Sequence, residues 1–121
     1  MTGRRERAER AGRRAETIAC LLLRAKGYRV LARRFRCPAG EIDVIARRGR
    51  LVCFVEVKAR ADREDALRAV TPKARQRIER AASTWLGRLG PFGAAPDVRY
   101  DLVTVTGGWP RHLKAAWRPG M

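Results

Sequence analysis

The chain has 121 residues, with 28 Lys and Arg against 12 Asp and Glu, and so a formal net charge of +16. This length predicts one domain over residues 1–121, and 45% hydrophobic residues argue against a disordered basic tail. The longest apolar run, residues 18–23, is far shorter than the roughly 20 residues of a membrane span, and no secretory signal is recognisable. We therefore expect a cytoplasmic protein without a membrane partner. The charge favours a polyanion, with nucleic acid ahead of an anionic membrane surface.

Residues 4–26 are predicted to form a helix, because small and apolar residues recur at helical spacing and Gly27 follows as a stop. The first 36 residues hold 12 Arg and Lys against 3 Glu, so over half of the excess charge lies in this part. Arg10, Arg13 and Arg14 are its candidate phosphate contacts. A membrane-surface role is a distant alternative, since the apolar side is mostly Ala and has no aromatic anchor.

Three strand-like runs follow, separated by short turns; they cover residues 28–36, 41–46 and 51–59. The third run is almost continuously apolar, which is typical of a central strand covered on both faces. The turn before it contributes further candidate nucleic-acid contacts, namely Arg47, Arg48 and Arg50.

The polar residues 60–70 are predicted to be a mobile loop. Thr71 and Pro72 fit the N-cap and first position of a second helix, which the Gly and Pro residues of 90–93 would end. A fourth strand over 99–106 comes next.

The two glycines at 107–108 break this strand, and a short edge strand is expected over 113–118. The order α-β-β-β-α-β predicts an α/β fold with a mixed sheet and helices packed on it.

Charged residues interrupt the apolar runs of the second and third strands. Alternate residues of a strand share a face, so we expect Glu41, Asp43 and Ile45 on one face, and Glu56 with Lys58 on one face of the next strand. The short turn would bring Asp43 near Glu56 and Lys58, in a register that the sequence leaves open. A structural salt bridge between Glu56 and Lys58 is the alternative, but charges in apolar runs are uncommon without a partner or a role.

Paired carboxylates suit Mg²⁺, which prefers one or two of them together with water and phosphate oxygens. Lys58 would then orient an attacking water or offset charge in the transition state. Glu16, at the edge of the apolar stripe of the first helix, is a fourth candidate; the alternative is a solvated glutamate paired along its own helix. The cysteines match no zinc spacing, and with His112 as the single histidine we expect Cys20 and Cys53 to pack in the core.

Several blocks of this sequence together resemble the bacterial YraN family of small nuclease-like proteins over nearly the whole chain. The blocks are Gly12–Glu16 with Ala19 and Leu22, Gly40–Ala46, Phe54–Arg60, Lys73 with Ile78, and Arg99–Val103. That family is similar to the PD-(D/E)XK nucleases, near the archaeal Holliday-junction resolvases. The resemblance implies an αβββαβ restriction-endonuclease-like core that uses Mg²⁺ or Mn²⁺.

By this resemblance, Asp43 and Glu56 fall on the metal-binding acids, Lys58 on the catalytic lysine and Glu16 on the helix-one acid. Lys73 falls where a supporting polar residue is frequent, and we place it among the nucleic-acid contacts, with a solvated helix face as the alternative.

The chain departs from the family at two positions. Arg34 stands where Asn is frequent, and Tyr100 where Phe is usual. Neither departure is expected to touch the metal site.

Two functions follow from these residues. The first is a metal-dependent endonuclease that hydrolyses DNA phosphodiesters, including those of branched DNA, with a homodimer as the candidate assembly. The second is a non-catalytic module with the same fold that binds nucleic acid or an acidic partner. Asp43, Glu56 and Lys58 favour the enzyme, because a pure binder has no need of buried carboxylates that repel phosphate.

Overall fold

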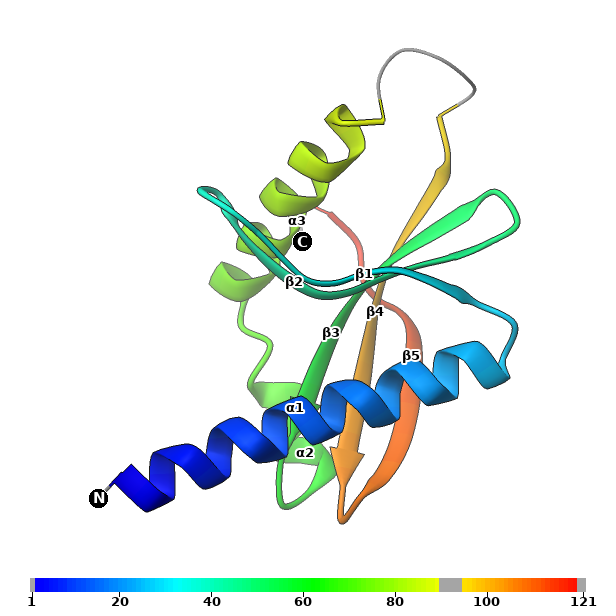
Figure 1. The fold of residues 1–121 in the computed structure, drawn as a ribbon. Helices are drawn as coiled ribbons and strands as arrows, with labels where there is room; N and C mark the ends of the chain where they lie inside the picture. The colour runs from blue at the N-terminus through cyan, green and yellow to red at the C-terminus, as the bar shows by residue number, and fades with distance from the viewer. Residues whose placement is uncertain (1, 90–94, 120–121) are drawn as a thin grey trace.

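A computed structural model of the chain describes residues 2–89 and 95–119. Its elements, in chain order, are α1 (Thr2–Ala25), β1 (Arg29–Cys37), β2 (Gly40–Arg48), β3 (Leu51–Ala59), α2 (Arg63–Arg68), α3 (Pro72–Gly87), β4 (Asp97–Thr106) and β5 (Trp109–Trp117). Figure 1 shows α1 lying across the sheet with its N-terminal turns extending past the strands. Among the described residues, no helix is long and apolar enough to cross a membrane.

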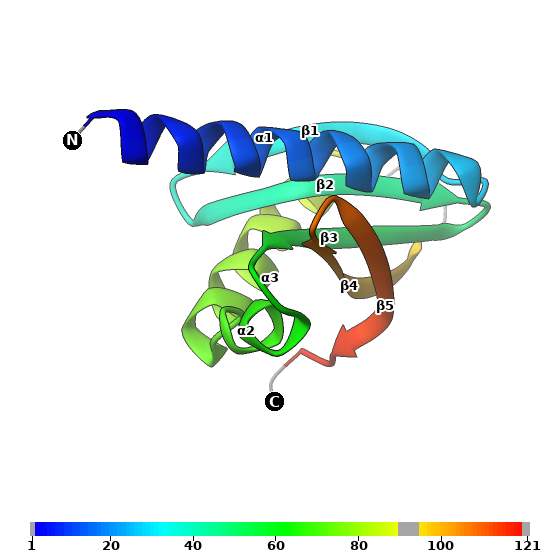
Figure 2. The same ribbon diagram turned by 90° about the horizontal axis from the view of Figure 1, so that it is seen from below.

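The five strands form one mixed sheet in the order β1-β2-β3-β4-β5. Only the β3–β4 pair is parallel among these strands, and α2 and α3 provide the connection between them. Figure 2 shows α1 on one face of the sheet and α2 with α3 on the other. The predicted α/β class, the mixed sheet and the central position of β3 are therefore confirmed.

Both faces of the sheet carry a buried core. On the α1 face, Ala19 and Leu23 pack with Cys20 and Cys53, which confirms the core role predicted for the two cysteines. The opposite core is built around Phe54, which is fully buried among residues of β2, β4 and α3. The side chains of β3 thus point alternately into two separate cores, as its nearly continuous apolar run predicts.

The prediction of a mobile loop over residues 60–70 is wrong, because α2 lies within it. Asp62 caps this helix by accepting a hydrogen bond from the Asp65 backbone N–H at 2.9 Å. Ala66 and Val70, four residues apart, are buried against the sheet. Ala66 anchors the short helix and Val70 anchors the segment after it, and the charged residues around them hid the helix in the sequence.

The helix cap at Thr71 is confirmed, since its hydroxyl accepts from the Ala74 N–H at 3.2 Å. The helix ends at Gly87, and the stop predicted at 90–93 lies outside the described residues. The last strand is longer than predicted: it begins at Trp109, directly after Gly107 and Gly108. Both glycines have positive φ, 58° and 77°, as a tight type I′ hairpin turn requires.

Candidate functional site

The antiparallel pairing of β2 and β3 brings Asp43 and Glu56 together. Val44 pairs with Val55, so one further step along the ladder places Asp43 opposite Glu56. The Asp43 carboxylate accepts a hydrogen bond from the Val57 N–H at 2.8 Å and is hydrogen-bonded to the Glu56 carboxyl group. The juxtaposition predicted from the hairpin is therefore present.

The alternation of β2 is irregular beside Asp43. Ile42 and Ile45 both pack in the core beneath α3, so the alternation of β2 is broken between them. The neighbouring strand is irregular at the same place: Arg34, which faces Asp43 across the ladder, has a φ of 53°.

Glu56 is held mainly in its neutral form. Burial raises the pKa of Glu56, and its hydrogen bond and charge repulsion with Asp43 raise it further, to about 9, against a smaller lowering effect of Lys58. Glu56 therefore keeps its proton near neutral pH. A divalent cation could replace that proton, because it would bind both carboxylates and remove their repulsion.

The pair opens into a cavity of about 320 Å³ between α1, the sheet and α3. Lys58 lines this cavity, as do Arg77 and Ala74 from the first half of α3. Close packing of α3 on the start of β2 depends on Gly40, where a Cβ atom would lie 2.5 Å from the Arg77 carbonyl oxygen. The glycine that precedes the Glu-Ile-Asp block thus sets the width of one wall of the site.

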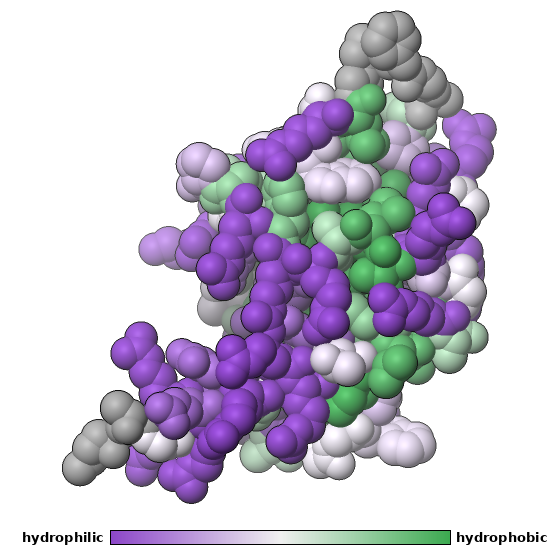
Figure 3. All heavy atoms as spheres, viewed as in Figure 1, coloured by the Kyte–Doolittle hydropathy of each residue, from purple (hydrophilic) through white to green (hydrophobic). Residues whose placement is uncertain are grey.

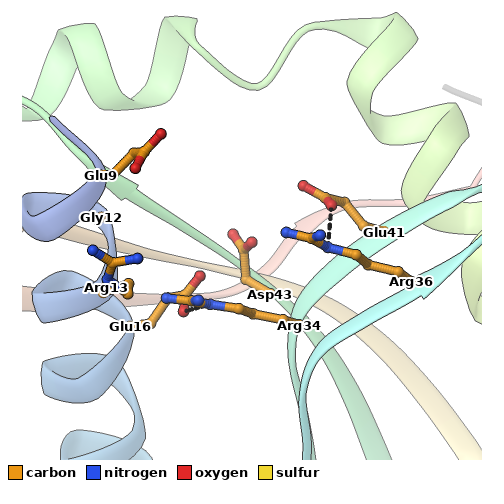
Figure 4. Close-up of a pocket in the computed structure, with 8 residues that line it drawn as sticks. All are labelled: Glu9, Gly12, Arg13, Glu16, Arg34, Arg36, Glu41 and Asp43. Atoms are coloured by element: carbon orange, nitrogen blue, oxygen red, sulfur yellow. Dashed lines mark hydrogen bonds and ion pairs between the residues drawn. The ribbon is translucent and has the colours of Figure 1, made fainter. Parts of the chain in front are cut away.

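A second cavity, of about 380 Å³, adjoins the first and shares Asp43, Glu16 and Glu41 with it. Figure 4 shows the Asp43 carboxylate between those of Glu16 and Glu41, each of which is paired with an arginine of β1. Arg34 Nε lies 2.6 Å from Glu16 Oε2, and Arg36 Nε lies 3.2 Å from Glu41 Oε2.

The Arg34–Glu16 pair decides one alternative and corrects one prediction. Glu16 pairs across space with β1 and not along its own helix, as the alternative had it, and the Arg34 departure from the family does reach the site. Because its charge is already balanced by Arg34, Glu16 is a weaker candidate ligand than Asp43 and Glu56.

Among the described residues, no three His, Cys, Asp or Glu side chains gather closely enough to enclose a metal ion. The donor set is two carboxylates and the backbone near Val57. That set fits Mg²⁺ or Mn²⁺, which keep several waters and take further oxygens from a phosphate, and it does not fit zinc.

The basic residues of α1 lie at the site end of the molecule. Arg13 lines the second cavity, and Arg10 and Arg14 are exposed on the same half of the helix. Figure 3 shows hydrophilic side chains gathered over this half of α1. Lys73 is exposed on the first turn of α3, near the side of α3 that lines the site.

The arginines of the β2–β3 turn lie elsewhere. The turn is at the other end of β3 from Glu56, about 20 Å away at the usual rise per strand residue. Arg48 stacks on the Tyr28 ring at 4.6 Å from its centroid and donates to the Lys26 carbonyl at 3.3 Å. Arg47 donates to the Gly49 carbonyl within its own turn at 2.8 Å. These residues, together with Arg50, are not brought together with the carboxylate pair.

Sequence reasoning assigned no role to Asp101, the fully buried acid of β4. Arg99 donates to both of its carboxylate oxygens at 2.7 Å, His112 Nε2 lies at 2.7 Å, and the Ala115 N–H donates at 3.0 Å. Burial alone would raise the pKa of Asp101, but the hydrogen bonds from His112 and Arg99 outweigh it and hold the pKa well below its usual range. The sequence did contain one sign of this role, because Asp101 stands directly before the apolar residues Leu102 and Val103.

The same network binds the end of α1 to the sheet. Lys26 Nζ lies 2.6 Å from His112 Nδ1, and Arg99 also donates to the Tyr28 hydroxyl at 2.7 Å. A lysine ammonium can only donate, so His112 Nδ1 must accept from it. His112 Nε2 then carries the hydrogen and donates a hydrogen bond to the Asp101 carboxylate. This cluster is closed and fully paired, which is typical of a structural group.

The fold is thus an α/β sheet with an αβββαβ order, carrying a carboxylate pair and a lysine on its central strands. The chain belongs to the uncharacterised protein family UPF0102, whose model matches residues 15–105. This confirms the predicted YraN-like family.

Curated relatives include UPF0102 proteins of Parvibaculum lavamentivorans, 55% identical over 113 residues, and of Maricaulis maris, 51% identical over 121 residues. The alignments cover 93% and 99% of this chain, and 84% and 94% of the relatives. A UPF0102 protein of Rhizobium meliloti is 52% identical over 115 residues, 94% of this chain and 93% of its own.

Proposed function

We propose that this protein is a Mg²⁺- or Mn²⁺-dependent endonuclease of the PD-(D/E)XK type that hydrolyses phosphodiesters of DNA, including branched DNA. The observation that carries the proposal is the Asp43–Glu56 pair, two facing carboxyl groups at the mouth of a cavity, with Lys58 beside them. Repulsion between two facing carboxylates destabilises the fold, and a bound cation would remove it. Perturbed acids in a cavity are typical of functional sites.

The cation would be held by Asp43, Glu56 and the backbone carbonyl of Val57. When bound, it would supply charge that lowers the pKa of water and offsets negative charge on the phosphoryl group. Asp43 is already oriented for this role, because the Val57 N–H fixes one of its oxygens at 2.8 Å. Preorganised ligands of this kind need little rearrangement on binding.

Lys58 would place its ammonium group beside the scissile phosphate. It can orient the attacking water by a hydrogen bond, or donate to a phosphate oxygen that gains charge in the transition state. Arg13 and Arg77, on opposite walls of the cavities, would bind the flanking phosphates. Such contacts position a strand without reading its sequence, so we expect binding that is independent of sequence and weakens steeply with salt.

Cleavage of a labelled panel tests the proposal: duplex, single strand, flap and four-way junction, each with Mn²⁺ and with EDTA. Asp43→Asn, Glu56→Gln and Lys58→Ala should each lower the rate by at least about 100-fold. Asp97→Asn is the matched control, because Asp97 is an exposed acid at the start of β4. Cutting that survives in Asp43→Asn would refute the site, provided that circular dichroism shows the variant is folded.

The non-catalytic binding module is the second candidate. It is favoured by the Arg34–Glu16 pair, which occupies the acid that the resemblance places on helix one. Salt-sensitive binding of the panel without cutting, in both Mn²⁺ and Mg²⁺, would support this alternative.

A further inference from the structure

Trp109 is the most exposed of the large hydrophobic residues that the structure describes, at 73% of its surface. Its backbone is constrained despite this exposure. Gly107 and Gly108 form the tight turn before it, and Pro110, which has a fixed φ, follows it on β5. A tryptophan also has only two side-chain torsions, so it loses little conformational entropy when it binds a partner.

The surroundings of Trp109 are basic. The indole lines a cavity of about 470 Å³, together with Arg63 at the start of α2 and Arg111 on β5. The one acid of this lining, Asp62, already accepts a hydrogen bond from the first turn of α2. A partner that fits must offer a flat ring face and negative charge close to it.

Trp109 lies on the same face of the sheet as Glu56 and Lys58. Lys58 pairs with Thr104, Thr104 pairs with Arg111, and Thr106 pairs with Trp109, so the side chains of each pair point the same way. Two strands across and two residues along place the Cα atom of Trp109 about 12 Å from that of Lys58. Helix α2 packs on β3 and β4 on this face, so a strand of nucleic acid that reaches both positions would pass over α2.

We propose that Trp109 stacks on an unpaired nucleobase while Arg63 and Arg111 bind the adjacent phosphates. In a duplex the ring faces of the bases are stacked on one another, and only the base edges are open in the grooves. An indole platform therefore selects a base that is single-stranded or displaced from its stack. The inference deepens and rests on the proposed function, in that it assigns the substrate a single-stranded segment beside the cleaved phosphate.

A second copy of this chain is a poorer fit for the same surface. The chain carries a formal charge of +16, and the rim around Trp109 is basic, so two such rims would repel each other.

Binding to a short fluorescein-labelled oligothymidylate, in EDTA so that no cleavage occurs, tests the proposal. Trp109→Ala should weaken this binding by about 5- to 150-fold, the usual loss for one stacked base. Trp109→Phe should keep most of the wild-type affinity for the oligothymidylate. The affinity of Trp109→Ala for a blunt duplex should fall by less than about twofold. Leu21→Ala is the matched control, since Leu21 is 59% exposed on α1 and should leave binding unchanged.

Salt dependence separates stacking from charge. The slope of log affinity against log salt should stay the same in Trp109→Ala and fall by about 0.7 in Arg111→Ala, because only the arginine releases a counterion. Unchanged single-strand affinity in Trp109→Ala would overturn the proposal, as would equal losses on single strand and duplex, or a change in oligomeric state by sedimentation.

The failure of this inference is distinguishable from that of the proposed function. If Trp109→Ala binds and cuts like the wild type while Asp43→Asn is inactive, the platform is wrong and the nuclease stands. If Trp109→Ala loses single-strand affinity in EDTA but no protein cuts, the platform stands and the nuclease is wrong.

Discussion

The same sheet contains a buried acid and a half-buried pair of acids, and their electrostatic surroundings differ. Asp101, on β4, is enclosed on the α1 face by donors from Arg99, His112 and Ala115. Asp43 and Glu56, on β2 and β3, face each other with one backbone N–H between them and a cavity alongside. The pKa of Asp101 is lowered, whereas that of Glu56 is raised.

The difference shows how to separate a structural acid from a functional one. Both groups lie next to apolar runs of the sequence, so the sequence pattern alone does not distinguish them. What distinguishes them is whether the protein itself supplies enough donors to compensate the charge. Asp101 is fully compensated and ties β4 and β5 to the end of α1, while Asp43 accepts one backbone N–H and we propose that a bound cation compensates the pair.

The largest effect should come from breaking the compensated group. Asp101→Asn leaves Arg99 without its buried counter-charge, and the free energy of unfolding should fall by about 3–5 kcal/mol in urea denaturation at pH 7. Because the pKa of Asp101 is lower in the fold than its usual value of 3.8, its stabilisation is present above that value and disappears as the pH falls through the folded pKa.

The deficit of Asp101→Asn should therefore shrink in acid. Asp97→Asn, an exposed acid at the start of the same strand, should change the free energy of unfolding by less than about 0.5 kcal/mol. A loss below about 1 kcal/mol in Asp101→Asn would show that the Arg99 and His112 contacts are not stabilising.

The uncompensated pair should respond in the opposite direction. The pKa of Glu56 is raised from 4.5 to about 9. Above pH 4.5 the unfolded chain therefore loses this proton more readily than the fold does, and the free energy of unfolding falls as the pH rises. In EDTA, Glu56→Gln should raise the free energy of unfolding at pH 8 by about 1–3 kcal/mol and leave it unchanged at pH 4. The same variant should lose Mn²⁺ binding by calorimetry.

Glu41→Gln is the control for this pair, because Glu41 lines the same cavity but is exposed and paired with Arg36 at 3.2 Å. It should shift stability by less than about 0.5 kcal/mol at either pH. If Glu56→Gln is destabilising at pH 8, the pair is compensated within the protein and the contrast with Asp101 does not hold.

Local patterns allowed most of the fold to be predicted. The bounds of β3, Leu51–Ala59, follow from one apolar run, and the start of α3 follows from the Thr71–Pro72 cap. Helix α2 was missed because its two buried contacts, Ala66 and Val70, are small and surrounded by charged residues. A short helix stabilised by packing has too few apolar residues to show a period.

The candidate site could be predicted where it depends on a hairpin and not where it depends on distant contacts. A short turn fixes the neighbours of β2 and β3, so Asp43 beside Glu56 followed from the sequence. Arg34 reaches Glu16 across 18 residues of chain, through a backbone irregularity that no spacing rule contains. Asp101 likewise acquires its partners from β5, 11 and 14 residues away.

The smallest effect should come from removing the partner of one compensated acid, which makes it an uncompensated acid like Asp43 and Glu56. Glu16 is compensated only by arginines of β1, chiefly Arg34, and its side chain is 12% exposed. Arg34→Asn removes the 2.6 Å ion pair and keeps a residue that tolerates the φ of 53°. The free energy of unfolding should fall by only about 0.5 kcal/mol, because Arg34 is 38% exposed.

Freed from Arg34, Glu16 adds its charge to Asp43 and Glu56, and Mn²⁺ affinity should rise by about three- to tenfold in calorimetric titration. Glu16→Gln in the Arg34→Asn background should cancel the gain, which identifies Glu16 as its source. Arg36→Asn, which frees Glu41 instead, is the parallel control. Equal Mn²⁺ affinity in Arg34→Asn and the wild type would place Glu16 with Asp101, as an acid whose partners are all internal and whose role is to join α1 to β1.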